Sequence, residues 1–194
     1  MKIIVLQHIK IEDPGYIKDL MLNDNVDLTT IELDEGEKIP QDLSNYDAMF
    51  CMGGPMDTWM EKDYPWLIDE KKRIKEFVVD LKKPYLGFCL GCQLLGEVIG
   101  GKVVRSNQPE IGMLDVKFSE NKNNDSLFFE FPEKITSLQW HSYEVQELEN
   151  NKDVTLIASS PETKFQIFKY KNHAYGIQFH IEIKNTTVGD WGCV

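Results

Sequence analysis

The sequence predicts an α/β fold in which a mostly parallel sheet is flanked by helices and continued by a small antiparallel β extension. Two observations predict it. In the first half of the chain, short apolar runs alternate with segments of helical periodicity, the order that builds parallel sheets. In the second half, strand-like runs follow one another without intervening helices, which is typical of antiparallel pairing. With 194 residues and no internal repeat or low-complexity linker, we expect one domain over residues 1–194.

The first half supplies the parallel part of this fold. Strands are expected at residues 2–6, 28–33, 48–52 and 85–89, each a short apolar run. Helices are expected after Pro14, over residues 66–81 and over residues 94–99. Pro14 suits a first helical turn, and the other two segments carry apolar side chains at helical spacing.

The second half supplies the antiparallel extension. Strands are expected at residues 102–105, 113–118, 135–140, 155–158, 165–170 and 175–179. Close to the end, Thr186 and Thr187 followed by Asp190 predict the start of a further helix, with a threonine N-cap and an early acidic residue.

Composition and charge exclude several classes of partner. The chain has 21 Lys and Arg against 32 Asp and Glu, a formal net charge of −11. Nucleic acid and anionic membrane surfaces require clustered basic residues, so we expect neither as a partner. No apolar run approaches the roughly 18 residues that span a bilayer, and the apolar stretch at the start is too short for a signal peptide. We therefore expect a soluble, cytoplasmic protein.

The four cysteines, Cys51, Cys89, Cys92 and Cys193, are too few for a disulfide framework and are expected to be reduced. Cys89 and Cys92 form a C-x-x-C pair, whose alternatives are a redox dithiol or half of a zinc site. No Trp or Pro flanks the pair as in redox motifs, and no second pair completes a zinc site, so we expect no metal.

The most specific feature is a G-x-C-x-G at residues 87–91, between an expected strand and an expected helix. It is the cysteine form of the nucleophile elbow, a strained turn that projects its central side chain above the sheet edge. Gly87 and Gly91 satisfy the need for small residues on both sides of Cys89. The amide dipoles of the following helix favour the thiolate. The alternative is a buried structural cysteine in a glycine-rich turn.

A nucleophilic cysteine needs a base and a group that orients the base. His180 ends an apolar run, and Glu182 follows two residues later, on the same face if the backbone is extended. Glu182 could then accept a hydrogen bond from the imidazole and stabilise the imidazolium. Taken alone, the pair is interpreted as a surface contact; together with the elbow at Cys89 it is expected to be a base and its orienting acid.

Glycines also follow the strand expected at residues 48–52. Gly53 and Gly54, before Pro55, expose backbone N–H groups without obstruction, which suits an oxyanion hole. The alternative is an ordinary turn.

Together, four ordered segments resemble the class I (triad-type) glutamine amidotransferases, especially free-standing members similar to the amidotransferase domain of GMP synthetase. The segments are residues 52–56 (MGGPM) with 64–67 (YPWL), 87–95 (GFCLGCQLL), 140–143 (WHSY) and 176–182 (GIQFHIE). The resemblance implies a three-layer, flavodoxin-like arrangement. The order Cys, His, Glu, with the acid so close after the histidine, differs from that of ordinary α/β-hydrolases.

The resemblance implies a glutaminase. Cys89 would attack the side-chain amide of glutamine, with His180 as base and then acid and Glu182 as its orienting group. Backbone N–H groups of Gly54 and Leu90 would hold the oxyanion. Ammonia would leave, and water would hydrolyse the γ-glutamyl thioester.

The same resemblance implies that Gly53, Gln93, Ser142 and Tyr143 bind the substrate, the last two through their backbone. Without the resemblance, Gln93 would be a helix-surface amide and Tyr143 a packed aromatic residue.

The chain departs from the family pattern in two places. Ile181 stands where the family has Pro between His and Glu, although the spacing of the two side chains is unchanged. Only 12 residues follow Glu182, where relatives continue through further helix, so we expect a truncated C-terminal end.

Other functions remain open. The same triad could serve a γ-glutamyl peptidase acting on small peptides, or the fold could be a catalytically silent regulatory or binding module. No phosphate-binding loop or dinucleotide fingerprint is present, so we expect no cofactor. An acceptor for ammonia would have to be a separate synthetase partner.

Overall fold

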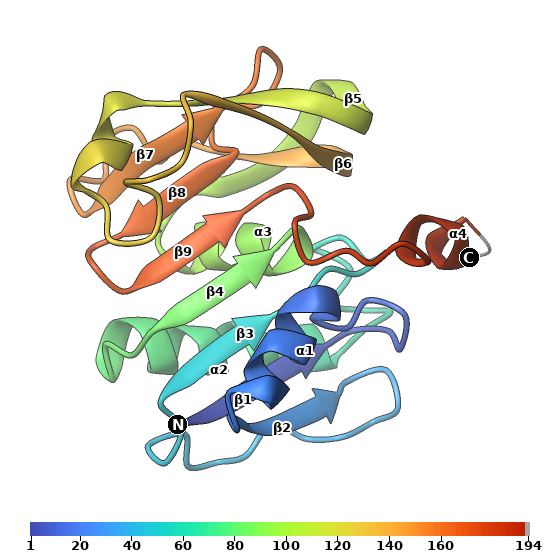
Figure 1. The fold of residues 1–194 in the computed structure, drawn as a ribbon. Helices are drawn as coiled ribbons and strands as arrows, with labels where there is room; N and C mark the ends of the chain where they lie inside the picture. The colour runs from blue at the N-terminus through green and yellow to red at the C-terminus, as the bar shows by residue number, and fades with distance from the viewer. Residues whose placement is uncertain (193–194) are drawn as a thin grey trace.

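The strands of the computed structural model, which describes residues 1–192, form one nine-stranded sheet in the order β2-β1-β3-β4-β9-β8-β7-β5-β6 (Figure 1). The strands are β1 (Lys2–Gln7), β2 (Asp27–Glu32), β3 (Ala48–Cys51), β4 (Tyr85–Phe88), β5 (Lys102–Phe118), β6 (Lys134–Gln146), β7 (Val154–Ser159), β8 (Ile167–Tyr170) and β9 (Ala174–Ile177). The helices are α1 (Gly15–Asn23), α2 (Trp66–Lys75), α3 (Leu90–Val98) and α4 (Thr187–Trp191).

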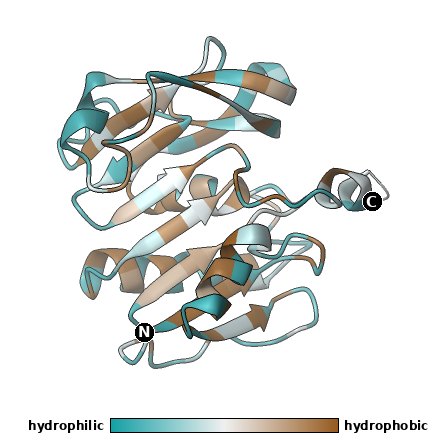
Figure 2. Ribbon diagram, viewed as in Figure 1, coloured by the Kyte–Doolittle hydropathy of each residue, from teal (hydrophilic) through white to brown (hydrophobic). Residues whose placement is uncertain are grey.

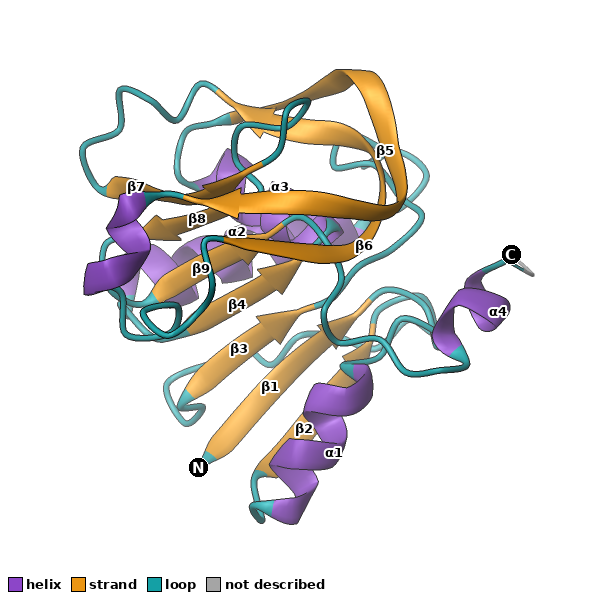
Figure 3. Ribbon diagram, turned by 45° about the horizontal axis from the view of Figure 1, so that its top comes forward, coloured by secondary structure: helices purple, strands orange, loops and turns teal. Residues whose placement is uncertain are grey.

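Five neighbouring strands of the sheet, β2, β1, β3, β4 and β9, pair in parallel. The other pairings, from β9 through β8, β7 and β5 to β6, are antiparallel. Helix α1 covers one face of the parallel part, while α2 and α3 cover the other (Figure 3). The predicted α/β fold, a mostly parallel sheet between helices with an antiparallel extension, is confirmed.

Strand β1 shows why the sheet needs helices on both faces. Its side chains alternate between two apolar cores, so Ile4 and Leu6 pack with the α2 and α3 side while Ile3 and Val5 pack with the α1 side. All four are buried. Burial of each such side chain contributes roughly 1.5–3 kcal/mol, and Figure 2 shows apolar residues along the strands of the sheet.

The antiparallel part differs from the sequence prediction at β5. The two strands expected at residues 102–105 and 113–118 are one strand of 17 residues, paired with β6 and shifted in register between Arg105 and Glu110. Pro109 and Gly112 interrupt the strand pattern of the sequence at this place. The register shift accommodates Pro109, because a bulge can absorb a residue that does not fit a regular ladder, whereas Gly112 pairs regularly with Gln139.

The helices also differ from prediction at their ends. The helix expected over residues 66–81 is α-helical only to Lys75 and continues as a π-helical turn, η1 (Glu76–Asp80). Helix α3 begins at Leu90, four residues before the expected start. Helix α4 forms where expected, but the Thr186 side chain makes no capping bond. Thr187 Oγ1 instead accepts a hydrogen bond from the Lys184 N–H at 2.8 Å.

The arrowheads of β1, β3, β4 and β9 point toward one edge of the sheet, and α4 lies beyond that edge (Figure 1). Carboxyl ends of parallel strands commonly carry ligand sites. Cys51, Cys89 and Cys92 are free thiols, whereas Cys193 lies outside the described residues. Within residues 1–192, no helix is both long and apolar enough to cross a membrane.

Candidate active site

Cys89 occupies the sharp turn between β4 and α3. Its backbone has φ 47° and ψ −102°, a conformation that costs a non-glycine residue roughly 1–3 kcal/mol. Hydrogen bonds to neighbouring segments hold the turn: the Cys89 N–H donates to the Ile177 carbonyl at 2.9 Å, and the Gly91 N–H donates to that of Met52 at 3.1 Å. The strained backbone is therefore fixed from both sides, and the side chain faces a cavity.

The two glycines of the turn are required by contacts. A Cβ atom on Gly87 would lie 2.5 Å from the backbone of Gly91, and one on Gly91 would lie 2.1 Å from the Cys51 carbonyl oxygen. Both distances are far shorter than real Cβ contacts. The predicted need for small residues on both sides of Cys89 is confirmed.

His180 and Glu182 are both buried, and the His180 Nδ1 lies 2.7 Å from Glu182 Oε1. The backbone reaches this geometry differently from the extended strand we predicted. Strand β9 ends at Ile177, and His180 is held by an isolated bridge in which its N–H donates to the Leu138 carbonyl at 2.9 Å.

The charges around His180 favour its protonated form. Burial alone would lower the pKa of His180, but the Glu182 carboxylate and a hydrogen bond with Cys89 together raise that pKa well above its ordinary value. The imidazole therefore lies between an acceptor on one side and the Cys89 sulfur on the other. This arrangement can move a proton between sulfur, ring and substrate.

Cys92 occupies a different environment from Cys89. Its side chain is fully buried in the apolar core. This burial, together with a smaller effect of the charge on the nearby Cys89, raises the pKa of the Cys92 thiol well above its ordinary value. Cys89 has 9% of its surface exposed, at the cavity. Only Cys89 of this pair is accessible to a small molecule.

The cavity beside Cys89 has a volume of about 340 Å³, in the range of small-molecule sites. It is bordered by residues from both halves of the chain: Ile9, Ile11, Glu12, Gly54, Pro55, Met56, Asp57, Cys89, Leu90, Gln93, Ile111, Trp140, His141, Ser142, Tyr143, His180 and Trp191. All the sequence-predicted site residues are among them except Gly53 and Glu182. Glu182 contacts the His180 ring at Nδ1, and a Cβ on Gly53 would lie 2.1 Å from Glu12 Oε2 and 3.4 Å from His180 Cε1.

Gln93 is not a surface amide. It is buried, and its Nε2 donates to the Tyr143 carbonyl and to Gln178 Oε1, each at 3.2 Å. The Tyr143 ring packs edge-on against Trp59, with ring centroids 4.6 Å apart. These contacts hold α3 and β6 together along one wall of the cavity.

Four further residues at or near the cavity, Glu12, His8, Trp191 and Glu70, make contacts that the sequence did not reveal. Glu12 lines the cavity, and burial raises the pKa of its carboxyl despite the nearby His180 and His8. Trp191 also lines it, and the fourth, Glu70, contacts His8 behind the Gly53 turn. The one available signal was position: His8 and Glu12 lie in the loop that follows the strand expected at residues 2–6, at the end of the sheet that also carries the Cys89 turn.

The family model described as "Glutamine amidotransferase class-I" matches residues 16–190. The chain belongs to this family. Among class I glutamine amidotransferases, its fold is similar to the crystal structure of a glutamine amidotransferase from Thermotoga maritima. The TM-score is 0.89 at 32% sequence identity, and the match covers 98% of this chain and 80% of that one.

Curated relatives agree with the resemblance to GMP synthetase amidotransferase domains. The chain is 30% identical over 154 residues to a glutamine-hydrolysing GMP synthase subunit of Sulfurisphaera tokodaii, covering 79% of this chain and 76% of the relative. It is 34% identical over 147 residues to the GMP synthase of Staphylococcus epidermidis, covering 75% of this chain. The match spans only about a quarter, 26%, of that longer relative.

Proposed function

We propose that this class I glutamine amidotransferase hydrolyses the side-chain amide of glutamine with Cys89 as nucleophile. The observation that carries the proposal is the strained Cys89 turn facing a cavity beside the buried His180–Glu182 pair, in which Nδ1 and Oε1 are 2.7 Å apart. Nucleophile, base and orienting acid are thus in the order that acyl transfer requires.

In the first half-reaction, His180 takes the proton of the Cys89 thiol, Sγ bonds to the amide carbon of glutamine, and the carbonyl electron pair moves to oxygen. Gly54 and Leu90 border the cavity beside Cys89, and their backbone N–H groups would stabilise that oxyanion. His180 gives its proton to the leaving nitrogen, the C–N bond breaks, and ammonia leaves.

In the second half-reaction, His180 takes a proton from water, and the hydroxyl oxygen bonds to the thioester carbon. The C–S bond breaks, His180 returns the proton to Cys89 Sγ, and glutamate is released. Glu182 holds the ring orientation throughout and stabilises the imidazolium.

The cavity wall formed by α3 and β6 would hold the amino-acid end of glutamine. Gln93, Ser142 and Tyr143 border the cavity there, and the Gln93–Tyr143 hydrogen bond keeps that wall in place. Gly53 does not border the cavity, so we assign it an indirect role through its peptide bond to Gly54.

The ammonia acceptor would be a separate synthetase. The relative from Sulfurisphaera tokodaii is named as a subunit, which supports a partner chain for this protein too. We propose that ammonia released at Cys89 passes to such a partner.

A second candidate is hydrolysis of γ-glutamyl peptides by the same residues. It is favoured by the apolar side of the cavity, where Ile11, Trp140 and Trp191 could accept a leaving group larger than ammonia.

One measurement separates the two candidates. The purified protein is given glutamine and, in parallel, γ-glutamyl dipeptides, and ammonia and free amine are measured. Ammonia from glutamine supports the amidotransferase, while preferential amine release supports the peptidase. Absence of turnover on every γ-glutamyl compound, with Cys89→Ala indistinguishable from wild type, would favour a silent binding module instead.

A further inference from the structure

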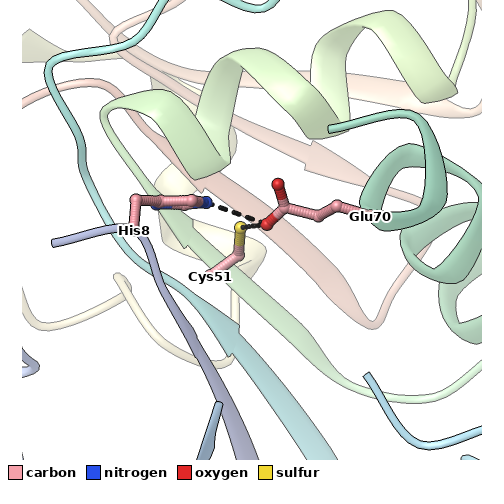
Figure 4. A group of neighbouring side chains, drawn as sticks. All are labelled: His8, Cys51 and Glu70. Carbon is pink, nitrogen blue, oxygen red and sulfur yellow. Dashed lines mark hydrogen bonds and ion pairs between the residues drawn. The ribbon is translucent and has the colours of Figure 1, made fainter. Parts of the chain in front are cut away.

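A fully buried polar cluster lies behind the Gly53–Gly54 turn. His8 directly follows β1, Cys51 ends β3, and Glu70 projects from α2, so three separate elements converge on it (Figure 4). None of the three residues is exposed to solvent. None has a part in the hydrolysis described above.

The hydrogen bonds of this cluster run toward the turn. His8 Nδ1 lies 2.8 Å from the Gly53 carbonyl oxygen and must donate to it, because a carbonyl can only accept. On the other side of the ring, His8 Nε2 lies 2.9 Å from Glu70 Oε1. The Cys51 thiol donates to the same Glu70 oxygen at 3.3 Å. Glu70 therefore orients His8, and His8 holds Gly53.

The environment of His8 favours the imidazolium. Burial lowers the pKa of His8, but the Glu70 carboxylate, the hydrogen bonds to Glu70 and Gly53, and the charge of Glu12 raise it above its ordinary value. The Trp66 ring stacks on the imidazole with centroids 5.5 Å apart and planes 23° apart. Contacts on its face and at both nitrogens thus fix the His8 ring.

The held carbonyl belongs to the peptide bond that carries the Gly54 N–H. In a planar trans peptide the C=O and N–H point in opposite directions, so fixing the Gly53 oxygen also fixes the direction of the Gly54 hydrogen. His8 packs directly on this peptide, since a Cβ on Gly54 would lie 2.9 Å from the His8 Cβ. A charged donor on the carbonyl also polarises the peptide and strengthens its N–H as a donor.

We propose that His8 and Glu70 are positioning residues that aim and polarise the Gly54 N–H toward the oxyanion formed at Cys89. This inference rests on the proposed hydrolysis and adds the residues that build its oxyanion hole. His8 and Glu70 touch neither substrate nor Cys89; they act through the Gly53–Gly54 peptide.

A metal ion is the competing use of the same atoms. The ligand atoms of His8, Cys51 and Glu70 lie within 4.8 Å of one another, and Glu70 Oε2 has no hydrogen-bond partner among residues 1–192. The hydrogen bonds favour the positioning role, because His8 Nε2, Cys51 Sγ and Glu70 Oε1 already satisfy one another. Metal content of the purified protein decides between the two uses.

The test compares graded variants in steady-state glutamine hydrolysis. Glu70→Gln keeps the side-chain shape but removes the charge, and His8→Asn keeps a donor near the Gly53 carbonyl. The double variant His8→Phe with Glu70→Gln removes the donor without leaving a buried charge. Loss of one oxyanion donor costs roughly 10²–10³-fold in kcat, so we expect about 10²-fold for the double variant and about 10-fold for each single one, with KM nearly unchanged.

The matched control is His173→Phe. His173 Nε2 also lies 2.9 Å from a backbone carbonyl, that of Val78, but on a different turn that does not border the cavity. Its loss should leave kcat unchanged. Thermal unfolding of every variant shows which are folded at the assay temperature.

Two reagents distinguish a loss of oxyanion stabilisation from a distortion of the site that also affects Cys89. Glutamate γ-semialdehyde forms a thiohemiacetal at Cys89 whose oxygen occupies the oxyanion hole, so its inhibition constant should rise in parallel with the fall in kcat. Iodoacetamide alkylates sulfur by displacement at a CH₂ group and forms no oxyanion, so its rate at Cys89 should stay within about twofold.

Three results would overturn the positioning role. They are a wild-type kcat in the folded double variant, an equal loss of iodoacetamide reactivity, or a stoichiometric metal that Cys51→Ala removes. Absence of γ-glutamyl hydrolysis by the wild-type protein is a different failure, because it counts against the proposed function itself.

Discussion

The indole of Trp191 packs edge-on against the imidazole of His180, with ring centroids 4.6 Å apart. Trp191 belongs to α4, and its Nε1–H donates to the Ile11 carbonyl at 3.1 Å. The segment after Glu182 thus returns to the cavity and covers the His180 ring. Because this contact excludes water from the ring, the electrostatic interactions of His180 with Glu182 and Cys89 are stronger than they would be in solvent.

Replacement of Trp191 should therefore weaken catalysis without removing a reacting group. We expect Trp191→Ala to lower kcat/KM for glutamine by roughly 5- to 30-fold, about 1–2 kcal/mol of transition-state stabilisation. The control is Tyr16→Ala, an exposed aromatic residue on α1. Equal kcat/KM in Trp191→Ala and wild type would mean that the indole does not protect His180.

The two cysteines of the C-x-x-C pair should respond differently to substitution. Cys89→Ala should abolish γ-glutamyl hydrolysis, because the nucleophile is lost. Cys92→Ala should retain most of the activity and lose about 1 kcal/mol of unfolding free energy, because Cys92 fills space in the core. Ammonia release and urea unfolding measure the two effects, and equal loss of activity in both variants would favour a dithiol site.

The base and its orienting acid should also be unequal. Glu182→Gln keeps an acceptor near His180 Nδ1 but loses the charge, so we expect kcat to fall by roughly 10²- to 10⁴-fold. His180→Ala removes the proton carrier itself and should lower kcat by about tenfold more. Single-turnover release of ammonia measures both. A larger loss in Glu182→Gln would contradict its role as the orienting group.

Sequence spacing predicted the parts of the site that are close together along the chain. Cys89 lies between two glycines that its turn requires, and Glu182 is two residues from His180, so a short motif could reveal each. His8 and Glu70 are 62 residues apart, and neither belongs to a short motif. Their contact depends on how α2 lies against the end of β1, which tertiary packing determines.

The fold shows the same division. The alternation of buried side chains in β1 was readable because its period follows directly from strand geometry. The continuity of β5 was not readable, because Pro109 and Gly112 suggested a break that the pairing with β6 spans. Local pattern therefore predicted the element types better than the extent of the long strand.

The contact between Gly91 and Cys51 makes the elbow sensitive to one added methyl group. Gly91→Ala would place its Cβ 2.1 Å from the Cys51 carbonyl oxygen, so backbone must move. We expect a loss of about 1–3 kcal/mol in unfolding free energy and slower alkylation of Cys89 by iodoacetamide. Gly189→Ala is the control, because a Cβ there would have no atom of residues 1–192 within 4 Å other than its own neighbours along the helix. Similar unfolding of the two variants would contradict the steric account.

The raised pKa of His180 makes a prediction about stability and pH. Because the folded-state pKa lies well above its ordinary value of 6.5, protonated His180 stabilises the fold in full below about pH 6.5, and this contribution is lost as pH rises through the raised pKa. Tm should therefore decline on the alkaline side.

Glu182→Gln identifies the source of that decline. The Glu182 carboxylate is the largest contribution that raises the pKa of His180, so the Tm of the variant should fall less than that of wild type as the pH rises above about 6.5. Calorimetry at half-unit pH intervals measures both curves, with Glu149→Gln as an exposed-acid control. Parallel curves for wild type and Glu182→Gln would show that the His180–Glu182 pair does not link protonation to folding.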